Sequence, residues 1–155
     1  MANKFSMQTL KSAAPFVFAC SLIFLFGGLF PPGEWYQALK RAPWSPPDLA
    51  FPIVWSLLYL CIAIAGHHIA KAKTHSLLLL WWAQLFINGL WSWIFFGQQL
   101  TLLGLVDISI LMGLVAGLMA GCWRANIRIA AYLLLPYLAW LMLATSLNAY
   151  IVIHN

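Results

Sequence analysis

Long apolar runs are the feature of this sequence that most limits how the chain can fold. The run from Leu102 to Cys122 contains a single charged residue, Asp107. A helix rises about 1.5 Å per residue and the hydrocarbon core of a bilayer is about 30 Å thick, so about 20 apolar residues cross it once. A membrane β-barrel would instead show strands that alternate polar and apolar residues. The runs therefore predict an all-α membrane protein, because helices satisfy their own backbone hydrogen bonds in lipid.

Composition sets the number of crossings. Only 7% of the 155 residues are charged, whereas a soluble domain carries roughly 25%, so most of the surface must face lipid. Five crossings with short loops use the whole chain, and we expect one domain, 1–155. The sequence predicts a bundle of five transmembrane helices, at about 13–30, 52–70, 77–96, 102–122 and 129–152.

The first predicted loop, 31–51, differs from an ordinary connector. It holds five of the eight prolines together with Trp35, Tyr36 and Trp44. Proline fixes the backbone and disfavours a long regular helix. A stiff aromatic loop of this length between two spans predicts a lid over one end of the bundle.

The basic residues predict an orientation. One side of the predicted bundle carries six of the eight: Lys4, Lys11, Lys71, Lys73, Arg124 and Arg128. Lys40 and Arg41 fall on the other side. The positive-inside rule then places the N-terminus on the cytoplasmic side, and the first loop and C-terminus on the opposite side. The basic residues form no run with interleaved polar residues, so we expect no nucleic-acid partner.

Polar and aromatic residues recur at helical spacing on one face of three spans. These faces carry Trp55, Tyr59 and Ile62; Trp81, Gln84, Asn88, Trp91 and Phe95; and Tyr137, Trp140, Ala144, Leu147 and Asn148. Polar groups that face lipid are costly, so these faces should turn inward. They describe either a cavity for a flat, mostly apolar ligand or a packed core with interhelical hydrogen bonds. Trp81, Trp82 and Trp123 lie near span ends, which is typical of an interfacial belt.

Other polar or small residues within the spans have two interpretations each. Asp107 is the only acid in a span, and the lack of a buried basic partner favours structural anchoring over transport. His67 and His68 are residue types that ligate haem iron, but their basic rim favours solvated side chains. Gly113, Gly117 and Gly121 allow close helix packing, either in a homodimer or within the bundle. Three scattered cysteines predict neither a disulfide framework nor a metal site.

Three segments carry a resemblance to a known family. They are WYQALKRAPWSPPDLAFPIVWSLLY from Trp35 to Tyr59, FINGLWSWIFFG from Phe86 to Gly97, and LLPYLAWLMLATSLNAYIV from Leu134 to Val152. Together with the five spans, their order and spacing resemble the TspO/MBR family, the translocator proteins once called peripheral-type benzodiazepine receptors. The resemblance covers nearly the whole chain.

The resemblance implies a five-helix bundle, often homodimeric, with a cavity open toward the first loop. Relatives bind tetrapyrroles such as protoporphyrin IX and haem there, as well as synthetic hydrophobic drugs. Carried over to this chain, the pocket residues are Trp55, Tyr59, Asn88, Trp91, Trp140, Ala144 and Leu147, with Trp44, Pro47 and Phe51 on the lid side.

We therefore expect a membrane protein that binds tetrapyrroles as a sensor, carrier or regulator, with no further cofactor required. One alternative is light-dependent photo-oxidative porphyrin degradation, in which Trp55 and Trp140 would take part. Another is a scaffold without its own ligand, with its cavity packed shut. Residues 151–155 after Tyr150 lack the Lys or Arg that ends the cholesterol motif of animal relatives, which favours a bacterial-type role.

Overall fold

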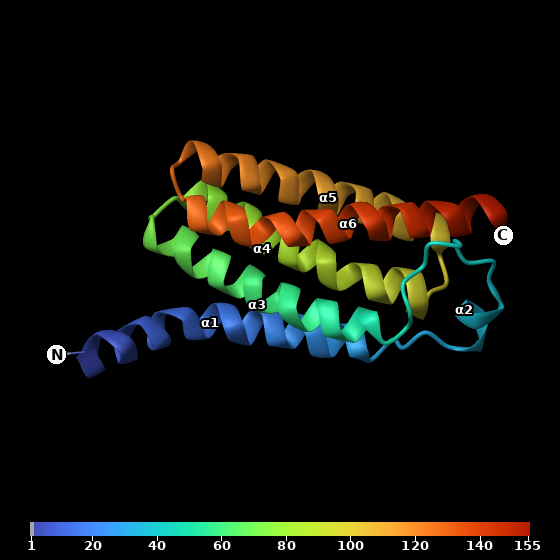
Figure 1. The fold of residues 1–155 in the computed structure, drawn as a ribbon, viewed down its shortest axis with the longest axis horizontal. Helices are drawn as coiled ribbons and strands as arrows, with labels where there is room; N and C mark the ends of the chain where they lie inside the picture. Colours follow the sequence, from blue (N-terminus) through green and yellow to red (C-terminus); the bar gives the residue numbers. More distant parts are fainter. Residues whose placement is uncertain (1) are drawn as a thin grey trace.

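The computed structural model describes the backbone of residues 2–155 and the side chains of residues 11–155. Five long helices lie side by side, and the described residues contain no strand (Figure 1). They are α1 Ala2–Gly28, α3 Ala50–Lys71, α4 His75–Ser92, α5 Thr101–Arg124 and α6 Arg128–His154. All five contain a stretch long and apolar enough to cross a membrane. The predicted all-α membrane bundle is confirmed.

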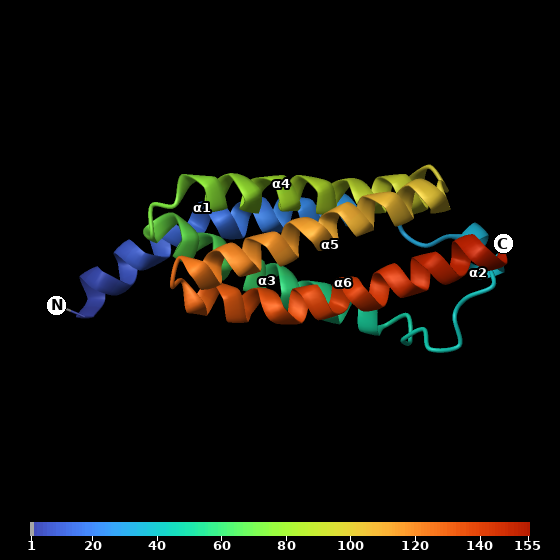
Figure 2. The same cartoon turned by 90° about the horizontal axis from the view of Figure 1, so that it is seen from above.

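The five helices form a closed ring. Each packs mainly against two neighbours, in the order α1, α3, α6, α5, α4 and back to α1, and α3 and α4 also touch across the ring. Figure 2 shows the long helices running along a common direction. A ring of five helices leaves space along its axis, which side chains must fill or leave open. The chemistry of the inward faces therefore decides where this protein is solid and where it is hollow.

Helix boundaries differ from the predicted spans near the first loop. Helix α1 ends at Gly28, two residues early, and α3 begins at Ala50, two residues early. The early start of α3 follows from a turn in which the Ala50 N–H donates to the Pro47 carbonyl. Pro52 then lies in the first turn, where its missing N–H costs no hydrogen bond. The first loop is thus residues 29–49, and it contains the short helix α2, Glu34–Ala38.

The third span ends in a wider turn than a regular helix would give. After α4, a π-helix labelled η1 covers Trp93–Gly97, and the Gln98 N–H donates to the Trp93 carbonyl five residues back. Short π-helical turns occur often at functional sites. Here the turn carries Phe95 and Phe96 beside the central space.

One half of the ring is solid, and Trp81 is at its centre. This side chain is 0% exposed, and its Nε1 donates to the Ile62 carbonyl over 2.9 Å. Trp81 therefore lies on the inward face that helical spacing predicts, and its alternative interfacial place is wrong. Gly66 gives the physical reason: a Cβ there would lie 2.5 Å from Trp81 Cε2, so only glycine admits the ring. Trp82 and Trp123 are exposed on the outer surface.

The three glycines of the predicted ridge on α5, Gly113, Gly117 and Gly121, divide between two environments. A Cβ on Gly121 would lie 2.5 Å from Leu77 Cδ2 of α4, so this glycine serves packing within the bundle. Beside Gly113 and Gly117 the described residues leave open space. The homodimer stays a prediction.

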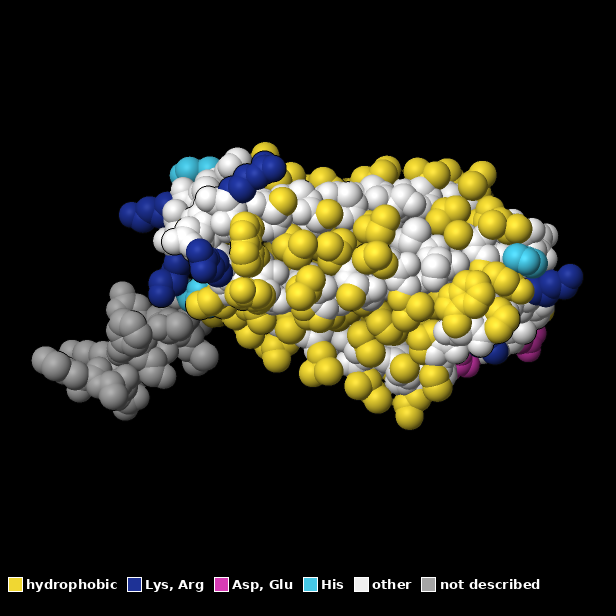
Figure 3. Space-filling view, turned by 45° about the horizontal axis from the view of Figure 1, so that its top comes forward, with side chains coloured by type: hydrophobic (Ala, Val, Ile, Leu, Met, Phe, Trp, Pro, Cys, Tyr) yellow, Lys and Arg dark blue, Asp and Glu magenta, His cyan; other side chains and the backbone are white. Residues whose placement is uncertain are grey.

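Charged side chains gather at the two ends of the bundle, with an apolar band between them (Figure 3). At one end, the α3–α4 and α5–α6 junctions carry Lys71, Lys73, Arg124 and Arg128, and at the other end the first loop carries Lys40 and Arg41. This distribution fits a multi-pass membrane protein. Which end faces the cytoplasm stays a prediction.

Candidate ligand-binding cavity

The half of the bundle nearest the first loop is hollow. A cavity of about 650 Å³ opens there, within the size range of pockets for small organic ligands. All five long helices, η1 and the first loop contribute to its wall. Of the two interpretations of the inward faces, this half therefore forms a cavity, and the packed-shut arrangement expected of a scaffold is not what the structure shows.

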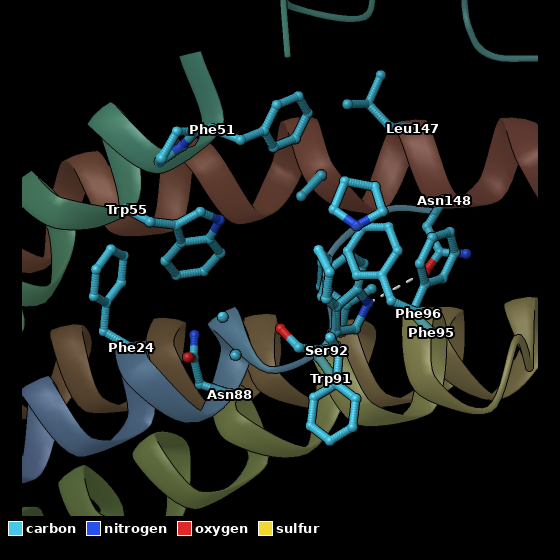
Figure 4. A pocket seen from close by; sticks show the side chains of 18 of the residues that line it. Phe24, Phe51, Trp55, Asn88, Trp91, Ser92, Phe95, Phe96, Leu147 and Asn148 are labelled. Atoms are coloured by element: carbon cyan, nitrogen blue, oxygen red, sulfur yellow. Dashed lines mark hydrogen bonds between the residues drawn. The ribbon is translucent and has the colours of Figure 1, made fainter. Parts of the chain in front are cut away.

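Eight of the ten predicted pocket residues line this cavity: Phe51, Trp55, Tyr59, Asn88, Trp91, Trp140, Ala144 and Leu147. Figure 4 shows Phe24, Trp55 and Asn88 toward one side of it and Trp91, Phe95 and Phe96 toward the other. Helices α3, α4 and α6 thus bring together residues from the three sequence segments. That these residues bind a ligand stays a prediction.

Trp44 and Pro47 do not line the cavity. The Trp44 Nε1 donates to Ser146 Oγ over 3.2 Å, and its ring packs edge-on against Tyr150 at 5.4 Å between centroids. Trp44 therefore fastens the first loop to α6. The Pro47 carbonyl accepts the turn bond that starts α3, so this residue shapes the loop without reaching the wall.

A chain of polar groups joins three helices at the deep end of the cavity. The Tyr59 hydroxyl donates to Asn88 Oδ1, and Asn88 Nδ2 donates to the Tyr137 hydroxyl over 2.8 Å. Both ends of the Asn88 amide are thereby occupied by α3 and α6. Asn88 consequently shapes the wall, with one N–H donor and one acceptor position of its amide already used within the protein.

A second polar chain closes the end of the cavity near η1. Trp91 Nε1 donates to Asn148 Oδ1 over 3.3 Å (dashed in Figure 4), and Asn148 Nδ2 donates to the Thr101 carbonyl over 2.9 Å. The Trp91 ring is stacked on Phe95, with centroids 4.9 Å apart and planes 10° apart. These contacts hold Trp91 flat against the wall.

Trp55 and Trp140 supply indole rings from α3 and α6. Trp55 lies beside Tyr59, with centroids 5.5 Å apart, and Phe51 packs edge-on against Trp140 at 5.6 Å. The buried Trp140 Nε1 has no hydrogen-bond acceptor among the described residues. A buried donor without a partner is costly, and Trp140 lines the cavity, so a ligand acceptor could satisfy it.

Sequence reasoning missed the contribution of α1. Its last turns place Phe24, Gly27 and Gly28 on the wall, and Phe30 and Pro31 follow them in the first loop. A Cβ on Gly27 would lie 3.2 Å from Ser92 Oγ, so the glycine allows α1 to approach α4 closely. The Gly27–Gly28 pair just before Pro31–Pro32 was the available signal.

The mouth of the cavity carries its charged groups. Asp48 and Tyr36 line it, and Arg41 Nη1 lies 2.9 Å from Asp48 Oδ1. The Arg41 guanidinium also sits 5.6 Å from the centroid of the Tyr36 ring. Burial raises the pKa of the Tyr36 phenol above its usual value, and the nearby Arg41 charge partly opposes this.

The remaining candidates lie away from the wall. His67 is buried, with its Nδ1 3.5 Å from Ser12 Oγ of α1, so the expectation of a solvated side chain is wrong for it. Asp107 is also buried, and its Oδ2 has no partner among the described residues. The described residues contain no cluster of three His, Cys, Asp or Glu side chains fit to hold a metal ion.

Comparison with known proteins decides the family. The sequence profile of the TspO/MBR family matches residues 16–154. The chain belongs to the TspO/MBR family. The tryptophan-rich sensory protein of Cereibacter sphaeroides is 33% identical to it over 134 residues, 86% of this chain and 84% of that one.

Two further relatives show how widely this TspO/MBR sequence is shared. The translocator protein of Homo sapiens is 34% identical over 145 residues, covering 88% of this chain and 85% of that one. Protein CrtK of Rhodobacter capsulatus is 31% identical over 146 residues, 91% of each chain. The resemblance inferred from the three sequence segments is confirmed.

Proposed function

We propose that this TspO/MBR protein binds a flat, mostly apolar tetrapyrrole, such as protoporphyrin IX or haem, in the cavity beneath the first loop. It would act as a sensor, carrier or regulator, and no further cofactor would be needed. The observation that carries the proposal is a cavity of about 650 Å³ with indole rings from two helices on its wall. Aromatic walls with few polar groups suit a flat conjugated ring.

The free donor on the wall adds to this support. Trp140 Nε1 lacks an acceptor among the described residues. The side-chain amides of Asn88 and Asn148, in contrast, donate hydrogen bonds to other protein groups. A ligand therefore meets a largely apolar wall with a donor at Trp140. Binding would rest mainly on ring contact and burial of apolar area.

The wall also favours one tetrapyrrole as the first probe. None of the described residues that line the cavity is His, Cys or Met, the side chains that most often ligate haem iron. The phenols of Tyr36 and Tyr59 are the remaining side chains of the wall that could ligate haem iron, and the Tyr59 hydroxyl already donates to Asn88. Metal-free protoporphyrin IX should therefore bind at least as well as haem.

A tryptophan-quenching titration in the dark tests the proposal. Purified protein would be titrated with protoporphyrin IX, in parallel with Trp140→Phe and with Trp123→Phe as a matched control. Trp123 is exposed at the far end of the bundle, 52% accessible. We expect saturable quenching that Trp140→Phe weakens about tenfold and Trp123→Phe leaves unchanged. Folded wild-type protein without saturable quenching would refute tetrapyrrole binding.

Light-dependent porphyrin degradation is a second candidate, favoured by the presence of both Trp55 and Trp140 on the wall. An excited porphyrin beside an indole can take an electron from it or pass energy to oxygen. Illumination of the complex should then bleach porphyrin absorbance only when oxygen and Trp55 are both present. Equal bleaching by Trp55→Phe would count against this activity.

Two statements about the assembly belong to the same proposal. The charge distribution supports a cytoplasmic N-terminus, and the open sides of Gly113 and Gly117 are compatible with a homodimer in the membrane. Accessibility of single cysteines at positions 40 and 73 to an impermeant thiol reagent would test the orientation. Labelling of position 73 from the outside would reverse it.

A further inference from the structure

The charges of the cavity are confined to its mouth. Among the described residues on the wall, Asp48 is the single acid, and none is Lys, Arg or His. Asp48 is in turn held by Arg41 of the same loop over 2.9 Å. The cavity is therefore an apolar chamber whose rim carries one ion pair.

We propose that Arg41 gives up its ion pair with Asp48 and binds a carboxylate of the ligand at this rim. Arg41 thereby selects flat ligands with an acidic edge. The inference rests on the proposed function and adds the chemical class that the site prefers. Ligand carboxylates would take the place that the Asp48 carboxylate now occupies.

A carboxylate cannot enter the chamber itself without a partner. Burial of an unpaired charge is strongly unfavourable. The described wall holds no cation, and its unpartnered donor, Trp140 Nε1, is neutral and does not compensate a carboxylate charge. A flat ligand with acidic arms along one edge must therefore enter apolar side first. Its carboxylates then remain at the mouth, beside the first loop.

Arg41 is the cation placed to receive them. Its guanidinium contacts two residues of the wall, Asp48 through Nη1 and Tyr36 through its ring. The side chain is 33% exposed and that of Asp48 is 60% exposed, so Asp48 can turn into water at little cost. The planar guanidinium fork can then hold a ligand carboxylate through paired hydrogen bonds.

Lys40 provides a matched control. It lies next to Arg41 in the same loop and carries the same charge. Neither side chain lines the wall, but Arg41 contacts Asp48 and Tyr36 of the wall, whereas Lys40 is exposed and makes no such ion pair or ring contact among the described residues. Its backbone groups, which bond the Asn155 side chain, are retained in Lys40→Gln. A general effect of loop charge would appear in both variants, whereas a carboxylate site would appear only at Arg41.

The experiment compares protoporphyrin IX with its dimethyl ester, which has the same ring but no carboxylates. Dissociation constants would be measured in the dark by tryptophan quenching for wild type, Arg41→Gln, Lys40→Gln and Asp48→Asn. The ratio of ester to acid dissociation constants cancels differences in detergent partitioning. We expect Arg41→Gln to lower this ratio roughly three- to tenfold, and Lys40→Gln to leave it unchanged.

Asp48→Asn gives an independent test, because it removes the partner of Arg41 without removing a cation. It should raise the ester-to-acid ratio by roughly twofold, and added salt should shrink that gain by screening. Equal ratios in wild type and Arg41→Gln would overturn the carboxylate site while leaving tetrapyrrole binding intact. If neither acid nor ester binds to folded wild type, the proposed function fails instead.

Discussion

The two halves of the bundle use the same helices and the same aromatic residue types, yet one half is solid and the other hollow. In the solid half, the Trp81 ring crosses to α3 because Gly66 leaves room for it, and its Nε1 finds the Ile62 carbonyl. In the hollow half, Trp140 packs against Phe51 at the wall, and its Nε1 has no partner among residues 11–155. The Trp81 ring thus fills the core because the residue opposite it is glycine.

The largest expected loss of stability comes from adding one methyl group to the solid half. Gly66→Ala would place a Cβ 2.5 Å from Trp81 Cε2 and 2.7 Å from Phe16 Cδ1. Overpacking of this kind costs about 1–3 kcal/mol, and here we expect about 3 kcal/mol, because two rings must move. Thermal unfolding in detergent would measure the loss.

Gly117→Ala is the matched control, because the described residues leave open space beside Gly117. Its stability should be unchanged or higher by up to about 1 kcal/mol, since alanine favours helix. Comparable destabilisation by both substitutions would mean that close packing is not what makes the first half solid.

Asn88→Ala acts at the boundary between the two halves, and its effect on stability should be smaller. The substitution leaves the fully buried Tyr137 hydroxyl without its Asn88 donor and removes the acceptor of Tyr59. A lost buried partner costs about 1–3 kcal/mol, so we expect about 2 kcal/mol by thermal unfolding. A change below about 0.5 kcal/mol would show that the polar chain does not hold these helices together.

Filling the hollow half should affect binding but not stability. Ala144→Leu adds three carbons to the cavity wall, and we expect about tenfold weaker binding of protoporphyrin IX, with less than about 1 kcal/mol change in unfolding. Ala139→Leu, on the exposed side of the same helix, should change neither. Unaltered affinity in Ala144→Leu would place the ligand elsewhere.

The smallest expected effect is on the rate of ligand dissociation, and it comes from a substitution in the loop that covers the hollow half. Trp44→Phe removes the hydrogen bond to Ser146 but keeps an aromatic ring beside Tyr150. An exposed bond of this kind contributes about 0.5–1 kcal/mol, so ligand dissociation should speed up roughly two- to fourfold. Stopped-flow quenching would measure this rate, and an unchanged rate would show that the loop does not limit ligand release.

Much of the candidate site could be read from the chain before its structure was seen. Trp55, Asn88 and Trp140 lie on helical faces whose polar groups lipid would disfavour, and all three line the cavity. Trp44, which the resemblance places on the lid side, lies in the first loop but does not reach the wall, because its ring packs on Tyr150 of α6. For Trp81 the sequence left two places open, an inward face and an interfacial belt, because an indole near a span end is stable in either environment, and the choice depended on Gly66 of another helix.

The sequence by itself determined the class, the five crossings and the inward faces of three helices, because burial in lipid imposes length and polarity rules along each helix separately. Only the tertiary structure decided that one half is filled and the other open, that α1 closes part of the wall, and that Arg41 and Asp48 meet at the mouth. These features depend on which side chains oppose one another across the ring of helices. Packing between helices sets which side chains oppose one another, and periodicity within a single helix does not.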